Sequence, residues 1–303
     1  MSLGFGGELA ALGGALLWAV ASVLYRRAGE QVPPRELNLL KGLLGAGLLA
    51  LTAWALRDPF PAAQPWAIGL LLLSGALGIG LGDTAYFQAL NDLGARRALL
   101  IEILAPPAAA LIAWAALGEA LRPAAWAGIA LTVAGVAWVV TERGGTGEDA
   151  RTRLPAHRAQ GIGAGLVAAL AQAGGAVLSR AALDGTQVSP LWSAVLRLAA
   201  GVGVLVVWLA VARRPLGGAG VRDRRGRPWG VLLGAILLGT YLALWLQQVS
   251  LQRVPAGIAQ TLFATSPLFV LPLAAWTGER VSPRAIVGVV VALGGVGLLF
   301  VGG

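Results

Sequence analysis

The stretch Ala98–Pro123 reads ALLIEILAPPAAALIAWAALGEALRP, and Ile258–Pro283, 160 residues later, reads IAQTLFATSPLFVLPLAAWTGERVSP. At this offset Pro107 aligns with Pro267, and each stretch ends in a Gly-Glu pair followed by a proline. The glycines that come next also align, in the pairs Gly128/Gly288 and Gly135/Gly295. Because the offset is too long for a solenoid repeat, the pattern indicates one chain built from two similar halves.

The composition is typical of a protein that spans the membrane many times. Hydrophobic residues make up 57% of the chain and charged residues 12%, against about 25% charged residues in an average soluble domain. The chain has no cysteine, which excludes disulfides and thiolate metal sites. The net charge of +9 comes from arginines that flank apolar runs, where they orient membrane spans, so it does not indicate nucleic-acid binding.

Ten apolar runs of about 20 residues are each long enough to cross the hydrocarbon core as a helix. The first lacks a basic n-region and a clear cleavage site, so we expect a retained span and not a signal peptide. The expected spans are Gly6–Tyr25, Glu36–Leu56, Pro65–Leu90, Arg97–Leu117, Ala124–Thr141, Gln160–Leu183, Pro190–Ala212, Pro228–Ser250, Ala256–Thr277 and Arg284–Val301.

A polar link over residues 142–159 divides these spans five to five. We therefore expect a first five-helix repeat over residues 1–141 and a second over residues 160–303. Because five is odd, the second repeat must enter the membrane from the opposite side. The predicted fold class is an all-α integral membrane protein with ten transmembrane helices in two inverted repeats.

The front parts of the halves match more loosely. Val32–Gly47 parallels Val188–Gly203, which places Lys41 on Arg197. This layout, with proline-containing fourth and ninth spans that end in Gly-Glu and a basic residue in spans two and seven, resembles the EamA family of the drug/metabolite transporter superfamily. The resemblance covers essentially the whole chain. It implies interleaved repeats around a central cavity, alternating access without a nucleotide-hydrolysing domain, and transport of small metabolites, often amino acids exported from bacteria.

The arginines predict the orientation of the spans. The loops after spans one, three, five, seven and nine hold 17 arginines, and the opposite side holds four. Since basic residues accumulate in cytoplasmic loops, both termini are expected outside the plasma (inner) membrane. Many relatives have cytoplasmic termini, so the resemblance and the arginine count disagree, and we follow the count.

Ionisable groups inside the spans are the first candidates for function, because burying each costs several kcal/mol unless it is paired or hydrated. Lys41, the only lysine, lies about 8 Å inside span two, and Asp83 and Glu102 lie at the same depth in spans three and four. Pairing of Lys41 with one carboxylate would leave the other as a proton site. The alternative is that Lys41 snorkels, Asp83 reaches water and Glu102 meets Arg96 or Arg97.

Two prolines follow Glu102. Pro106 and Pro107 cannot donate hydrogen bonds to the carbonyls four residues earlier, so the helix is expected to break or loosen there, and Pro267 is the matching position in the second half. Broken helices at membrane depth occur where protein or a watery cavity satisfies the backbone, and a simple kink is the alternative.

The second half carries different polar groups. Arg197 lies inside span seven, but the positions that match the two acidic residues are Ala243 and Leu262, so repeat symmetry gives it no acidic partner. An unpaired guanidinium that faces a cavity would suit a carboxylate or phosphate; bonding to backbone carbonyls is the alternative. Gln260 and Pro267, seven residues apart, are expected to share a helix face and form a preferred pair.

Other features bear on function class. Four aromatic residues deep in spans could stack on a ligand or simply pack: Trp18, Tyr86, Tyr241 and Trp245. The one histidine, His157, lies in the polar link, which argues against a histidine metal site, and no GxxxxGK[ST] phosphate loop occurs. We therefore expect no cofactor, no metal and no enzymatic activity.

The function hypothesis is secondary active transport of a small polar or zwitterionic metabolite such as an amino acid, with export as the direction and proton coupling as an option. Translocation of a lipid or lipid-linked headgroup is the alternative, and an intramembrane lipid-modifying enzyme is the weaker one. The expected partners are a small-molecule substrate and the lipid bilayer, without nucleic acid. Monomer and homodimer both stay open.

Overall fold

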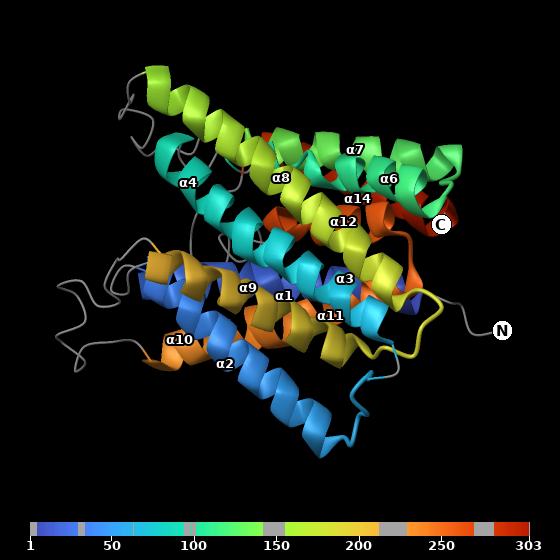
Figure 1. Cartoon of the computed structure of the whole chain (residues 1–303). Helices are drawn as coiled ribbons and strands as arrows, with labels where there is room; N and C mark the ends of the chain where they lie inside the picture. Colours follow the sequence, from blue (N-terminus) through green and yellow to red (C-terminus); the bar gives the residue numbers. More distant parts are fainter. Residues whose placement is uncertain are drawn as a thin grey trace.

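The computed structural model describes residues 5–29, 34–62, 64–93, 98, 101–141, 155–211, 229–269 and 282–302. Within these residues every regular element is a helix (Figure 1). Seven helices are long and apolar enough, by length and composition, to cross a membrane, and two shorter apolar helices, Ala105–Leu117 and Ile286–Phe300, accompany them in the described part. The chain is therefore a multi-pass membrane protein.

The helices follow the expected spans closely. In the first half they are α1 (Gly6–Gly29), α2 (Pro34–Ala55), α3 (Pro65–Gly75), the π-helical η1 (Ala76–Gly82), α4 (Asp83–Leu93), α6 (Ala105–Leu117) and α7 (Pro123–Val140). In the second half they are α8 (Pro155–Leu183), α9 (Pro190–Val211), α10 (Trp229–Ala235), the π-helical η5 (Ile236–Ala243), α11 (Leu244–Arg253), α12 (Ala256–Phe263) and α14 (Pro283–Gly302).

The third and eighth expected spans each widen into a π-helix midway, at η1 and η5, which begin 160 residues apart. The sequence analysis did not predict these segments. Insertions of this kind are frequent at functional sites, because they redirect the side chains that follow them. In the first half the residue that follows η1 directly is Asp83.

The fourth and ninth expected spans are interrupted by turns, at residues 103–104 and 264–265. In the fourth span α6 begins directly after the turn, so Pro106 and Pro107 lie in its first turn, where a missing amide proton leaves no intrahelical bond unmade. In the ninth span Pro267 follows the turn by two residues. Residues 270–281, which include Gly278 and Glu279, lie outside the described part.

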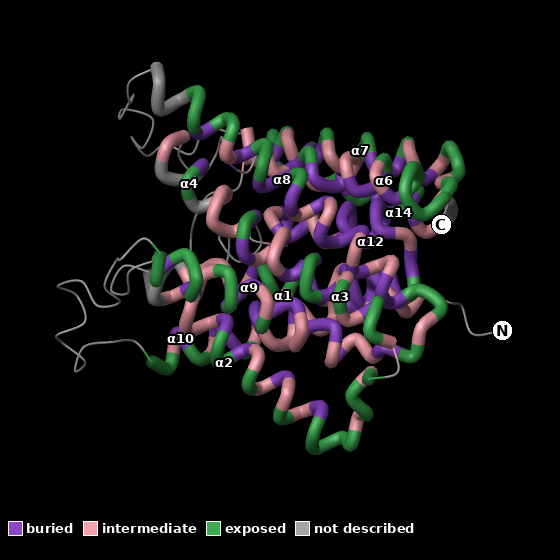
Figure 2. Tube along the Cα trace, viewed as in Figure 1, coloured by how far each residue is buried: buried purple, intermediate pink, exposed green. Residues whose placement is uncertain are grey.

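Helices from different halves pack against one another. α7 packs along α14, and α2 packs along α9. The first helix of the first half, α1, contacts α10, η5 and α11 of the second half. The first helix of the second half, α8, contacts the matching elements α3, η1 and α4 of the first half. Figure 2 shows the buried residues concentrated in the interior where α6, α8, α12 and α14 meet. The start of α1 and the end of α14 lie close together, since the ring centroids of Phe5 and Phe300 are 5.2 Å apart.

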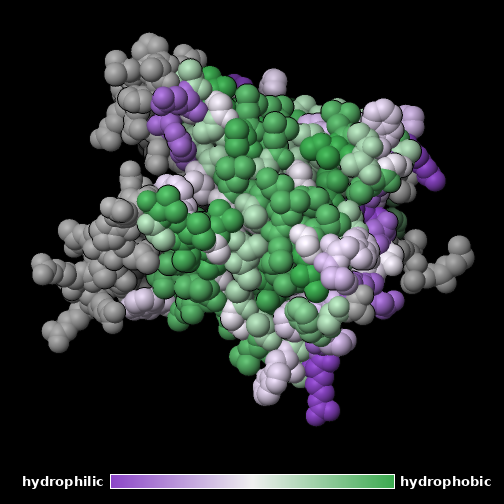
Figure 3. All heavy atoms as spheres, viewed as in Figure 1, coloured by the Kyte–Doolittle hydropathy of each residue, from purple (hydrophilic) through white to green (hydrophobic). Residues whose placement is uncertain are grey.

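The outer surface of the bundle is apolar. On the face shown in Figure 3, hydrophobic side chains cover the middle of the molecule and hydrophilic ones lie towards its edges. Large exposed side chains include Leu51, Trp54, Leu73, Leu170, Val206 and Val207. An apolar surface of this extent fits contact with lipid and not with water.

α7 and α14 approach so closely that backbone meets backbone. A Cβ atom at Gly135 would lie 2.5 Å from the amide nitrogen of Ala292, and one at Gly295 would lie 2.5 Å from a backbone nitrogen of α7. A Cβ at Gly128 would lie 2.9 Å from the carbonyl oxygen of Gly295, and one at Gly288 would lie 3.0 Å from that of Gly135. All four glycines that align between the two halves of the sequence therefore lie in this contact. Close approach through small residues is a common way to pack helices in lipid.

Replacing Gly135 by alanine is expected to destabilise the protein, because the added methyl group would meet backbone atoms that cannot move aside. Overpacking of this kind costs about 1–3 kcal/mol. Gly297→Ala, in α14 where a Cβ would meet nothing within 4 Å, is the matched control. Thermal melts of the detergent-purified proteins test this, and equal melting temperatures for the two variants would contradict the close approach.

Candidate functional site

Asp83 is the centre of a polar cluster that both halves contribute to. Its Oδ2 atom lies 3.4 Å from Lys41 Nζ of α2, and its Oδ1 atom accepts a hydrogen bond of 3.4 Å from Gln172 Nε2 of α8. The side chains of Lys41 and Asp83 are 14% and 21% exposed. Of the two pairings that the sequence left open for Lys41, the structure forms the one with Asp83.

Glu102 lies at the end of the helical segment that precedes the turn of the fourth span. The Tyr86 hydroxyl of α4 is within hydrogen-bonding reach of the Glu102 carboxylate, and Asp83 is near enough to repel it electrostatically. In the part of the chain that the structure describes, no ion pair joins Glu102 to Lys41. The alternative partners Arg96 and Arg97 lie outside the described residues.

Arg197 approaches the same place from α9. Only 3% of the residue is exposed, and among the described residues neither its Nε nor its Nη1 atom has a hydrogen-bond partner. A Cβ built on Gly78 would lie 3.4 Å from Arg197 Nη2 and 3.6 Å from Gln172 Oε1. Asp83, from the other half, is near enough to stabilise the charge of the guanidinium. We call Lys41, Asp83, Tyr86, Glu102, Gln172 and Arg197 the Asp83 cluster.

Two glycines, one at the end of α3 and one in η1, set the position of this cluster. A Cβ at Gly75 of α3 would lie 2.1 Å from the carbonyl oxygen of Arg197, and one at Gly80 of η1 would lie 2.8 Å from Val204. A side chain at either position would therefore push this segment away from α9. These two glycines were not singled out from the sequence; they hold the end of α3 and η1 against α9 and so keep Gly78 opposite the guanidinium.

Gln260 of α12 extends the cluster from the second half. Its Nε2 atom donates a hydrogen bond of 3.4 Å to the backbone carbonyl of Gln172. Gln260 and Pro267 were expected to share a helix face because they are seven residues apart. That reasoning does not apply, because α12 ends at Phe263 and a turn separates the two residues. A helical spacing of seven places residues on one face only while the helix is continuous.

The other three aromatic candidates have packing contacts. The Tyr241 hydroxyl is 2.9 Å from Thr52 Oγ1, and the Tyr241 ring lies 6.2 Å from Trp245, where both pack against α2 and α9. Trp18 lies 6.4 Å from Tyr25 and is 36% exposed. The structure thus brings Tyr86 to the ionisable side chains and gives these three residues contacts with neighbouring helices. Within the described residues, no group of three or more His, Asp or Glu side chains is arranged to hold a metal.

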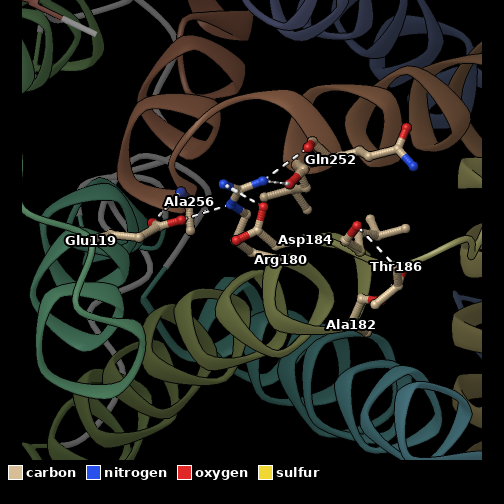
Figure 4. A network of polar contacts seen from close by, with 9 residues as sticks. Glu119, Arg180, Ala182, Asp184, Thr186, Gln252 and Ala256 are labelled. Atoms are coloured by element: carbon tan, nitrogen blue, oxygen red, sulfur yellow. Dashed lines mark hydrogen bonds and ion pairs between the residues drawn. The ribbon is translucent and has the colours of Figure 1, made fainter. Parts of the chain in front are cut away.

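A second polar network, which the sequence analysis did not predict, joins α6 and α8 to α11 and α12 (Figure 4). Glu119 Oε1 accepts a hydrogen bond of 2.7 Å from Arg180 Nε, and Glu119 Oε2 accepts one of 3.0 Å from the backbone N–H of Ala256. Arg180 Nη1 donates to the carbonyls of Leu251 and Gln252 at 3.2 and 2.9 Å. A carboxylate thus faces the N-terminus of α12 and a guanidinium the C-terminus of α11, as the helix dipoles favour.

The aligned Gly-Glu pair explains how Glu119 reaches this network. Gly118 ends α6 with a φ of 69°, the left-handed conformation that glycine adopts without strain, and its N–H bonds to the carbonyl of Trp114 at 3.2 Å. The chain turns away from the helix there and carries Glu119 towards Arg180. The aligned Gly-Glu pair includes Glu119, but no spacing rule predicts its contact with an arginine 61 residues later.

Glu119→Gln is expected to lower the melting temperature strongly. Both side chains of the Glu119–Arg180 pair are nearly buried, at 13% and 12% exposed, and loss of one partner from a buried pair costs up to about 3–5 kcal/mol. Asp184→Asn is the matched control, because Asp184 also contacts Arg180, at 3.2 Å, but is 65% exposed. Exposed pairs contribute about 0–1 kcal/mol. Equal melting of both variants would mean that the network does not hold these helices together.

The sequence model of the EamA-like transporter family matches this chain twice, over residues 5–141 and 159–301. The chain belongs to the EamA-like transporter family. The expected resemblance is thereby confirmed, and EamA-like proteins are membrane transporters of the drug/metabolite transporter superfamily.

Other comparisons agree with the family assignment. The uncharacterized transporter YwfM of Bacillus subtilis is 25% identical over 289 residues, which cover 95% of this chain and 90% of that protein. The uncharacterized protein PA1977 of Pseudomonas aeruginosa is 31% identical over 138 residues, which span 46% of this chain and 47% of that protein, about half its length. A crystal structure that is 21% identical superposes with a TM-score of 0.79 over 96% of this chain and 95% of that chain, which shows a shared fold.

Proposed function

We propose that this EamA-like protein is a secondary active transporter that exports a small polar or zwitterionic metabolite, such as an amino acid, by alternating access. The observation that carries the proposal is the Asp83 cluster, in which ionisable side chains from both halves lie inside a membrane bundle. Such groups are expensive to bury and are typically found where a polar solute or an ion crosses the membrane. A bundle with a purely structural role would not require them.

Inverted repeats would supply the alternating access. In support, the family match covers each half separately, and the π-helices and the turns of the broken spans recur at matching positions. Helices of each half pack on the other half in reciprocal pairs. Phe5 before α1 contacts Phe300 in the last turns of α14, as expected if an even number of spans returns the chain to its starting side. We therefore infer ten spans, five in residues 1–141 and five in 160–303, joined by the polar link.

Proton coupling is assigned to Glu102. Lys41 pairs with Asp83 and neutralises its charge, whereas Glu102 has no lysine or arginine partner among the described residues. The interruption of the helix at residues 103–104 adjoins this carboxylate. A broken helix at membrane depth fits a site that water or a solute reaches.

The direct test is transport by the purified full-length chain in proteoliposomes. Radiolabelled amino acids and other small polar solutes are loaded inside, a pH gradient is imposed, and release is compared with protein-free vesicles. Accumulation or release of any of these solutes supports the proposal. If no solute moves while a fluorescent phospholipid is scrambled between leaflets, the protein is a lipid translocase and the proposal is wrong.

Glu102→Gln is expected to abolish transport driven by a pH gradient and to preserve equilibrium exchange of substrate. Glutamine has the shape of the protonated glutamate but cannot release the proton, and exchange needs no net proton movement. The groups that face Glu102 are Tyr86 and Asp83, the latter paired with Lys41, and none of them is altered. Asp184→Asn, on the exposed side of the molecule, is the control.

Two results would remove Glu102 from the coupling mechanism. Normal pH-driven flux in the glutamine variant would show that the carboxylate carries no proton. Loss of both modes of transport together with a lowered melting temperature would show that Glu102 is needed for the fold.

The orientation follows from the arginines. With 17 arginines on one side and four on the other, we expect residues 213–227 in the cytoplasm and Gly303 outside. The chain has no cysteine, so a single cysteine placed at either site can be labelled in intact cells with an impermeant maleimide. Labelling is expected at the C-terminus, and labelling within 213–227 instead would reverse the assigned orientation.

A further inference from the structure

We propose that Arg197 and the space beside Gly78 form an oxyanion-binding subsite, which restricts the transported solute to molecules with a carboxylate or phosphate group. That the protein transports this solute rests on the function proposed above. The binding subsite itself rests on the geometry of α9, η1 and α8.

The first observation is a buried charge with unused donors. Arg197 is 3% exposed, and its Nε and Nη1 atoms have no partner among the described residues. A buried guanidinium is normally paired and hydrogen-bonded, because each missing bond leaves an uncompensated desolvation cost. The matching residue of the first half, Lys41, does have a carboxylate partner in Asp83. Asp83 also lies near Arg197, but no direct contact joins the two among the described residues. The two basic residues at aligned positions therefore differ in direct pairing, and the unused donors of Arg197 indicate an anion that binds there.

The second observation is a small gap in front of the guanidinium. Gly78 presents no side chain, and a methyl group built there would fill the gap at ordinary contact distance, 3.4 Å from Arg197 Nη2 and 3.6 Å from Gln172 Oε1. The gap is therefore large enough for one oxygen atom of a ligand. Arginine binds oxyanions with two parallel N–H groups, either Nε with Nη2 or Nη1 with Nη2. Each of these two pairs of nitrogens consists of Nη2, which borders the gap, and an atom without a partner, Nε or Nη1. The guanidinium can therefore donate two hydrogen bonds to one oxyanion.

The binding test uses benzoate, phenyl phosphate and the neutral control benzamide, at equal ionic strength, on the detergent-purified full-length protein. Concentration-dependent thermal shifts give apparent affinities. We expect benzoate, phenyl phosphate or both to bind and benzamide not to bind. A response to benzoate alone assigns a carboxylate site, and one to phenyl phosphate alone assigns a phosphate site. Equal binding of benzamide, or no binding by any of the three, overturns the proposal.

Arg197→Met separates binding from structure. Charge-assisted hydrogen bonds contribute enough that their loss should weaken oxyanion binding about tenfold to a hundredfold. Arg197→Lys keeps the charge but lacks the fork, so its affinity should fall between the two. A buried charge with unsatisfied donors is costly, and hydrophobic replacement of buried charged groups is often neutral or stabilising, so the methionine variant should melt no lower than the wild type. Unchanged binding, or a large drop in melting temperature, would show a structural arginine and overturn the proposal.

Gly78→Ala tests the site while Arg197 stays in place. The added methyl group occupies the space beside Nη2 and should weaken oxyanion binding about tenfold or more through lost hydrogen bonds. Gly203→Ala, in the same helix as Arg197 where a Cβ meets nothing within 4 Å, is the matched control and should bind as the wild type does. Equal affinity of the two alanine variants would place the anion elsewhere.

Two outcomes distinguish the absence of an oxyanion subsite from the absence of transport. Solute flux that is unaffected by Arg197→Met and Gly78→Ala would leave the transporter intact and remove the oxyanion subsite. Oxyanion binding that depends on Arg197, without flux of any solute, would retain the subsite and refute transport.

Discussion

Every polar group in this bundle must find its partner inside the protein, because hydrocarbon offers neither water nor counter-ions. The Glu119–Arg180 network satisfies this constraint completely: the two charges bond to each other and to the free ends of α11 and α12. Lys41 and Asp83 satisfy it in part, with one contact of 3.4 Å between them and a second of 3.4 Å from Gln172 to Asp83. Arg197 does not satisfy it at Nε and Nη1. The degree of satisfaction thus separates the Glu119–Arg180 network, which joins helices, from the side chains that we propose bind a ligand.

Small residues control how the charged groups come together. Glycines at the α7–α14 contact and Gly75 at the α3–α9 contact remove the side chains that would keep backbones apart. This close approach gives dispersion contact in a solvent where the hydrophobic effect cannot pull helices together. Gly78 of η1, one turn after Gly75, has the opposite effect, because its missing side chain leaves a methyl-sized gap beside a guanidinium. Two glycines one turn apart therefore provide the packing and the gap.

Hydropathy alone predicted most of the helices, because spans that cross lipid must be apolar and about 20 residues long. The prolines also indicated where the fourth span would loosen, since the reason is local to the backbone. The side-chain contacts could not be predicted from the sequence. Depth within a span did not decide whether Lys41 would pair with Asp83 or Glu102, and no spacing rule connects Glu119 to Arg180 across different helices. The π-helices depend on how η1 and η5 pack against the opposite half, which a single chain segment does not encode.

Comparison of the aligned positions separates fold from function. Where the halves match, at the glycines of α7 and α14, Gly128 meets Gly295 and Gly135 meets Gly288, so the same contact is built twice. Where they differ, the differences concern charge: Asp83 aligns with Ala243 and Glu102 with Leu262. A structural requirement that arises from the repeat would apply to both halves and would preserve both residues. Under the proposed function the substrate is a small metabolite with one anionic end, which has no two-fold symmetry. A site that binds it between two similar halves would be asymmetric, with acidic residues in one half and, in the other, an arginine whose Nε and Nη1 atoms have no hydrogen-bond partner among the described residues.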